Sequence, residues 1–250
     1  MPLKNKRYVW NNDEVAECPT VNGRLILPGG CTVSRGALST IEDGVTIYDS
    51  CIIGNGAVIK ANAVIGYRVA LALEVLISDW AVIGAGARIG TSSVVSSYAV
   101  LSNDVSIGTK SDIHSNVSVG RGSLIGDACV IEQGSTIGKQ VVIRNRAIIG
   151  AWSKIADGVR LGSRIHLAQD SHIMFTPLSI QGPHHLVTLV SLTDIQIGSE
   201  VLDFTGWNDP SRSQIFKRLG IAGEWVKAYV DILNFLEDYA SDFGHLIFGH

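Results

Sequence analysis

The sequence predicts an all-β solenoid, a coiled chain whose short strands stack along one axis, and three observations carry this prediction. Residues 45–176 divide into 22 consecutive six-residue units with no residue left over. The third place of every unit is Ile, Leu or Val, from Ile47 to Ile173. The first place is Ala, Val, Ser or Cys in every unit except the one that begins at Ile165. A fixed period over such a length is typical of a repeat architecture.

The six-residue period indicates short strands that meet at regular corners, because six is neither a helical period nor a simple strand alternation. Places one and three lie on the same side of a strand, and a small residue beside a large one fills a narrow interior. Gly stands at place four in ten units, for example Gly54 and Gly120. We expect these glycines to supply the backbone freedom of a tight corner.

With this pattern the chain resembles the hexapeptide-repeat, or isoleucine-patch, family. The resemblance implies a left-handed parallel β-helix of triangular section with three six-residue units per coil, and it covers about half of the chain. In such a coil, residues 18 apart in sequence lie above one another, at roughly the 5 Å spacing of neighbouring strands. The sequence alone then predicts which side chains are neighbours.

The flanks of the repeat divide the chain into three expected parts: a cap with the first hexads in residues 1–44, the β-helix in 45–176, and an appendage in 177–250. In the cap we expect strands at residues 7–10 and 24–27. Asp43-Gly44 is a turn dipeptide that we expect to shift the repeat register by two residues.

The C-terminal appendage is predicted to hold a β-hairpin and two α-helices. Its expected elements are a loop at 177–183, strands at 185–190 and 195–204, and helices at about 211–219 and 223–239. Asp209-Pro210 offers an N-cap and a first-turn proline for the first of these helices.

Composition excludes several classes of protein. A net charge of −3 over 250 residues argues against nucleic-acid binding, which needs a basic surplus. The sequence contains no uninterrupted run of 18 apolar residues, so no membrane-spanning helix is predicted. The four cysteines lack the spacing of metal ligands, and two of them, Cys51 and Cys129, stand at place one. Reduced cysteines that pack in the interior of a cytoplasmic protein are therefore expected.

His114 and Glu132 are the predicted catalytic residues. They differ by 18 positions, so the carboxylate is expected on the rung next to the imidazole, where it would orient a general base. Acyltransferases of the family use such a histidine to deprotonate an acceptor, and the resemblance implies this role for His114. The alternative is a solvated surface pair of little energetic consequence.

Arg144, Arg146 and Arg164 are the predicted cofactor-binding residues, together with Trp152. Arg146 and Arg164 differ by 18, so like charges meet on adjacent rungs and favour an anionic ligand between them. Coenzyme A meets that need with its phosphates, and Trp152 offers a surface on which its adenine can stack. The alternative is that Asp127, Asp157 or an acidic partner chain neutralises the arginines.

The resemblance implies a trimeric acyltransferase that uses acetyl-coenzyme A or another acyl-coenzyme A, a hydroxyl or amine of a small-molecule acceptor, and no metal. A non-catalytic trimeric scaffold is the alternative, although the C-terminal elements cap the end that a polymer would have to stack. A γ-carbonic-anhydrase-like metalloprotein is a minor alternative because no histidine triad is evident. His166, His172, His184 and His185 are left without a role, and we expect at most one of the last two to face any given site.

Overall fold

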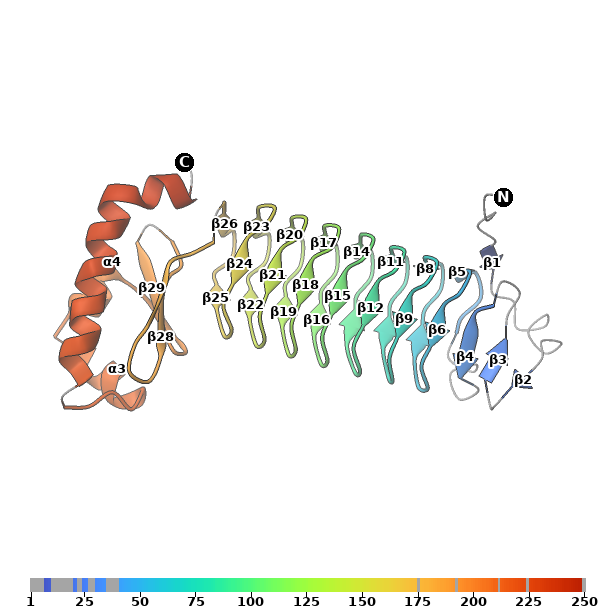
Figure 1. Cartoon of the computed structure of the whole chain (residues 1–250), viewed down its shortest axis with the longest axis horizontal. Helices are drawn as coiled ribbons and strands as arrows, with labels where there is room; N and C mark the ends of the chain where they lie inside the picture. The colour runs from blue at the N-terminus through green and yellow to red at the C-terminus, as the bar shows by residue number, and fades with distance from the viewer. Residues whose placement is uncertain are drawn as a thin grey trace.

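The computed structural model describes residues 7–9, 20–21, 24–26, 30–34 and 41–248, apart from 175, 192, 211 and 224. It confirms the parallel β-solenoid (Figure 1). The coils run from a small N-terminal cap to a C-terminal sheet that is flanked by helices. Trp10, Leu27 and most of the expected cap lie outside the described residues.

Three sheets form the faces of the solenoid, and we number them in the order in which the chain visits them. The first face contains β1 (Arg7–Val9), β5 (Thr46–Tyr48), β8 (Val64–Ile65), β11 (Val82–Ile83), β14 (Val100–Leu101), β17 (Ser118–Val119), β20 (Thr136–Ile137), β23 (Lys154–Ile155) and β26 (His172–Ile173). The second contains β2 (Thr20–Val21), β3 (Arg24–Ile26), β4 (Thr32–Ser34), β6 (Ile52–Ile53), β9 (Ala70–Leu71), β12 (Arg88–Ile89), β15 (Ser106–Ile107), β18 (Leu124–Ile125), β21 (Val142–Ile143) and β24 (Arg160–Leu161). The third contains β7 (Val58–Ile59), β10 (Leu76–Ile77), β13 (Val94–Val95), β16 (Asp112–Ile113), β19 (Val130–Ile131), β22 (Ile148–Ile149) and β25 (His166–Leu167).

Neighbouring strands within the coils pair in parallel at an interval of 18 residues, as predicted; Asp112 pairs with Val130, and Val130 with Ile148. The expected register shift at Asp43-Gly44 is wrong. Ile41 already bridges Ile59 at the regular interval, whereas Thr32 pairs with Ile52 at an interval of 20. The regular interval is therefore already in place at Ile41, and Asp43-Gly44 is an ordinary corner of the repeat.

The interior is built by places one and three. Ile113 and Ile131 are fully buried, and so are the small residues beside them, such as Ala147. Each buried isoleucine contributes about 1.5–3 kcal/mol by leaving water. Because the pattern repeats on every rung, this contribution accumulates along the whole solenoid.

The corners place the left-handed backbone conformation at place six and not at place four. Trp80, Tyr98 and Trp152 all have φ between 60° and 62°, and the glycines of this place, such as Gly134, share the conformation. The place-four glycines therefore do not supply the left-handed backbone of the corner, and that prediction is wrong. A Cβ on Gly120 would lie 2.5 Å from the carbonyl of Gly138, so glycine is needed there because consecutive coils approach closely.

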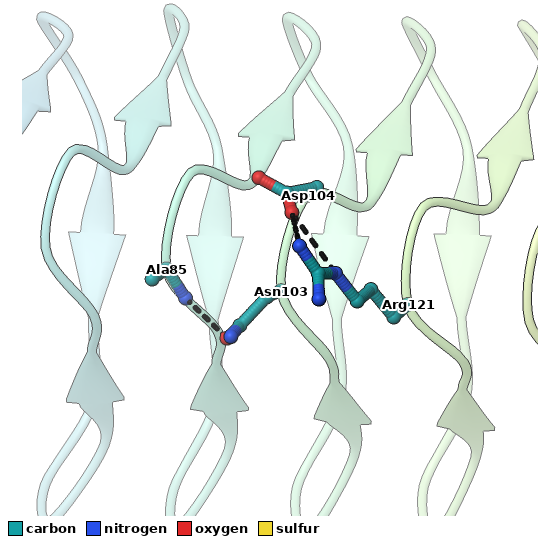
Figure 2. Close-up of polar contacts among 4 residues, drawn as sticks. All are labelled: Ala85, Asn103, Asp104 and Arg121. Carbon is teal, nitrogen blue, oxygen red and sulfur yellow. Dashed lines mark hydrogen bonds and ion pairs between the residues drawn. The ribbon is translucent and has the colours of Figure 1, made fainter.

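At several corners a side-chain oxygen accepts a hydrogen bond from the backbone N–H of the residue at place five. Figure 2 shows the Asn103 amide oxygen accepting from Ala85 N at 2.9 Å, beside an ion pair between Asp104 and Arg121. Asp157 accepts from Lys139 N in the same way, at 2.7 Å. These side chains give the backbone N–H an acceptor that water would otherwise have to provide.

Both ends of the solenoid are closed. At the N-terminal end β1 and β3 pair antiparallel with β5 and β4. At the C-terminal end Thr176 Oγ1 accepts from the backbone N of Arg160 at 3.0 Å. Gln196 accepts from His166 N at 2.8 Å and donates to the carbonyl of Arg164 at 2.6 Å, so its amide replaces part of the missing next strand.

The C-terminal part contains more secondary structure than predicted. Its antiparallel sheet has four strands instead of a hairpin: β27 (Ser179–Gln181), β28 (Leu186–Leu189), β29 (Asp194–Ile197) and β30 (Glu200–Asp203). Its helices are α2 (Phe204–Asn208), which was not predicted, α3 (Arg212–Arg218) and α4 (Trp225–Phe248), which extends well beyond the expected end at Tyr239. No helix in the described part of the chain is both long and apolar enough to cross a bilayer.

Candidate functional site

The three predicted arginines line one pocket of about 660 Å³ at the corner between the second and third faces. Arg144 and Arg146 flank Asn145 on one rung, and Arg164 lies on the next rung. The wall opposite them comes from the C-terminal sheet, through Gln181, Gln196 and the residues that precede β28. The structure thus brings Arg144, Arg146 and Arg164 together as the 18-residue interval predicts.

No carboxylate within the described ranges forms an ion pair with Arg144, Arg146 or Arg164. The two acids considered as neutralising partners are engaged elsewhere. Asp127 accepts from Thr109 N at 2.7 Å, and Asp157 accepts from Lys139 N. The pocket therefore carries three exposed cationic groups, which favour an anionic ligand.

His184 and His185 both line this pocket, contrary to the expectation that only one would face a given site. They precede β28, so the side-to-side alternation of a strand does not apply to them. The Tyr229 hydroxyl accepts from both of their backbone N–H groups, at 3.0 and 2.7 Å. The His185 ring also bonds through Nε2 to the carbonyl of Leu219 at 2.7 Å.

His114 lies at the corner between the third and first faces, in a shallow pocket of about 310 Å³. Its Nε2 lies 3.4 Å from Oδ2 of Asp112, which stands two residues earlier on β16. Both side chains are a little under half exposed, at 41% and 45%. An imidazole held by a carboxylate at one nitrogen can accept a proton at the other.

Glu132 does not take the position expected beside His114. Its Oε2 accepts from the backbone N of Ala151 at 3.0 Å, on the coil above. Glu42 makes the same contact with Ala61 N, also at 3.0 Å. A glutamate at place four therefore reaches the free N–H of place five on the next coil, and Asp112 holds the position next to His114 that Glu132 was expected to hold.

Trp152 lies apart from the arginine pocket, at the corner that also holds His114. The two sites are separated by the third face, because Trp152 follows β22 whereas Arg146 precedes it. The indole packs over Gly134, where a Cβ would collide with its ring, and the side chain is 51% exposed. The structure therefore does not bring Trp152 together with the arginines.

Gln181, His184, His185 and Gln196 are pocket residues that sequence reasoning missed. They come from the part of the chain without a period, where no interval predicts neighbours. His166 and His172 lie on the third and first faces, as expected. Within the described residues of one chain no three His, Cys, Asp or Glu side chains form a group that could hold a metal.

Three solved structures illustrate what the chain is similar to. LpxA from Acinetobacter baumannii is 16% identical over 68% of this chain and 72% of that one, with a TM-score of 0.47. The UDP-N-acetylglucosamine acyltransferase of Francisella novicida is 19% identical over 80% and 75%, with a TM-score of 0.41. The acetyltransferase domain of PglB from Neisseria gonorrhoeae is 19% identical over 52% and 54%, with a TM-score of 0.29, so the match spans about half of that domain.

One protein-family model matches part of the sequence. The family model described as bacterial transferase hexapeptide (six repeats) matches residues 128–163. These residues include Glu132, Arg144, Arg146 and Trp152 but not His114. A search of curated proteins found no match.

Proposed function

Because the chain carries a hexapeptide repeat whose residues 128–163 match the family model of bacterial hexapeptide transferases, we propose that it moves an acyl group from acyl-coenzyme A to a hydroxyl or amine of a small-molecule acceptor. Acetyl is the simplest such group. One observation carries the proposal. The arginine pocket and the His114–Asp112 pair lie on opposite edges of the third face, and Arg146 is two rungs from His114.

The arginine pocket suits the phosphates of the donor. Guanidinium groups bind phosphate with two parallel hydrogen bonds, and Arg144, Arg146 and Arg164 have no ionic partner within the described residues. Between this pocket and His114 the third face presents Val130 and Ile148 outward, both half-buried. Two rungs span roughly 10 Å along the axis, which a pantetheine arm can cross over these apolar side chains.

The proposed chemistry is a direct transfer. Asp112 holds the proton of His114 on Nε2, which leaves the Nδ1 lone pair to accept the proton of the acceptor hydroxyl or amine. The acceptor attacks the thioester carbon, and the carbon–sulfur bond breaks. The imidazolium then returns the proton to the departing thiolate, so that acylated acceptor and free coenzyme A leave.

We predict that removing two arginines weakens donor binding. Calorimetry with acetyl-coenzyme A should show binding to the parent chain and an affinity at least about 10-fold lower for Arg146→Ala/Arg164→Ala, because charged hydrogen bonds are lost. Arg121→Ala is the matched control, since Arg121 is an exposed arginine on another corner that pairs with Asp104. If the parent chain binds no donor, the scaffold alternative is favoured.

We also propose a homotrimer, supported by an exposed apolar strip. Trp80 and Tyr98 lie on the corner between the third and first faces, and Val82 and Val100 lie beside them on the first face; each is at least 37% exposed. Trp80 and Tyr98 adopt a left-handed backbone at φ 60° and 62°, which costs an aromatic residue about 1–2 kcal/mol relative to glycine. Covering these side chains in an interface would offset that cost.

The strip predicts the behaviour of a charged variant. Light scattering should give three times the chain mass for the parent protein and a lower mass for Val82→Lys/Val100→Lys. Thr136→Lys, on the same face but outside the strip, is the control and should keep the parent mass. The chain already has a lysine, Lys154, at place two on this face, so the lysines introduced there should be compatible with the fold. A parent protein that is monomeric would contradict the proposal.

A further inference from the structure

Two thiols meet in the first coil of the solenoid. Thr32 of β4 pairs with Ile52 of β6, so Cys31 and Cys51 immediately precede paired residues on adjacent rungs. Both cysteines are free and 1% exposed. Cys31 and Cys51 are 20 residues apart, and the pairing of Thr32 with Ile52 at the same interval brings them into line.

The contacts of the two sulfur atoms place them against each other. Cys51 N donates to Cys31 Sγ at 3.3 Å. Both thiols lie within hydrogen-bond distance of one acceptor, the carbonyl of Tyr48, at 2.7 and 3.0 Å. Neighbouring strands lie about 4.8 Å apart, which is within the separation of about 4.4–6.8 Å that the Cα atoms of a disulfide require.

Cys129 provides an internal comparison. It is equally buried at place one, but its neighbours in the same column are Ser111 and Ala147. Its Sγ bonds to the carbonyl of Arg144 at 3.1 Å. A partner thiol, and not burial at place one, is what distinguishes Cys31 and Cys51 from Cys129.

The surroundings also shift the pKa values of the two thiols in opposite directions. The hydrogen bond from the Cys51 thiol lowers the pKa of Cys31. The same contact and burial raise the pKa of Cys51. Since the thiolate is the nucleophile, Cys31 is the sulfur that reacts first.

We propose that Cys31 and Cys51 are a modification site, a dithiol that hydrogen peroxide converts into a disulfide. The Cys31 thiolate attacks a peroxide oxygen, the O–O bond breaks, and the departing hydroxide takes up the proton that Cys31 had lost, so that a sulfenic acid and water form. The Cys51 sulfur then attacks the Cys31 sulfur, the S–O bond breaks, and the second water leaves with the Cys51 proton. Each thiol sulfur loses one electron, and the peroxide gains two.

The buried site lies at the end of the solenoid, where transient opening would admit a small oxidant and where a cross-link has a consequence. End repeats of a solenoid open more readily than central ones, because each repeat is held only by its neighbours. A bond between residues 31 and 51 would fasten β4, and with it β3, to the first regular coil. The oxidised protein should therefore be harder to open at its N-terminal end.

The test treats the folded full-length Cys18→Ser variant with hydrogen peroxide, because Cys18 lies outside the described residues. Intact mass should fall by two hydrogen atoms, and peptide mapping should find Cys31 linked to Cys51, reversibly with dithiothreitol. Adding Cys129→Ser should leave the link unchanged, whereas Cys51→Ser, or Cys51→Ala if the serine variant does not fold, should abolish it. Oxygen addition at Cys31 without a cross-link, a cross-link to Cys129, or no mass change under conditions that oxidise the denatured chain would each overturn the proposal.

Discussion

Replacing His114 with glutamine is expected to lower kcat for acyl transfer by about 100-fold to 10,000-fold, the range that general-base catalysis contributes. The donor affinity should be almost unchanged, because the arginine pocket lies two rungs away on the opposite edge of the third face. Steady-state kinetics with acetyl-coenzyme A and a panel of hydroxyl and amine acceptors measure kcat, and calorimetry measures the affinity. A loss confined to kcat identifies a group that acts in the transition state.

Two further variants sharpen this result. Asp112→Asn keeps the shape of the side chain but removes the charge 3.4 Å from His114, so it should lower kcat by a smaller factor. His172→Gln changes an exposed histidine on β26 and should leave kcat as it is. Full turnover by His114→Gln, with donor binding intact, would exclude His114 as the base and leave the donor pocket standing.

The repeat made the solenoid, its register and the arginine cluster predictable, because an interval of 18 residues is a spatial contact wherever the period is unbroken. The same reasoning failed for Glu132, although the interval itself is correct. The glutamate side chain is long enough to reach the unpaired N–H of Ala151 on the coil above, and that donor offers a better contact than a half-exposed imidazole. The same arrangement recurs between Glu42 and Ala61.

The C-terminal part shows where sequence patterns stop being informative. β27 lies between two prolines and was expected to be a loop, yet proline is compatible with the flanks of an edge strand. The end of α4 was expected at about Tyr239, which is too early, since no proline interrupts the chain up to Phe248. His184, His185 and Gln196 form a wall of the pocket only because the C-terminal sheet packs against the last coils of the solenoid. No local sequence pattern predicts that packing.

Gln196→Leu is expected to destabilise the protein by about 2–4 kcal/mol, because the variant leaves three backbone groups without their partner. Gln196 is 4% exposed and bonds the N–H of His166, the carbonyl of Arg164 and the carbonyl of Gly198. Leucine has a similar volume but can neither accept nor donate. Urea denaturation should measure the loss of stability, and hydrogen exchange at the His166 amide should become faster.

The same variant tests whether the C-terminal sheet shapes the donor pocket. Arg164 is held in place through its carbonyl by Gln196, so Gln196→Leu should weaken acetyl-coenzyme A binding even in the fraction that remains folded. Gln181→Leu is the matched control, since Gln181 lines the pocket but is exposed and bonds only locally, to the carbonyl of Gly182. It should cost no more than about 0.5 kcal/mol. Equal stability of the two variants would mean that the end of the third face does not depend on Gln196, and the C-terminal sheet would then be a neighbour of the pocket rather than its support.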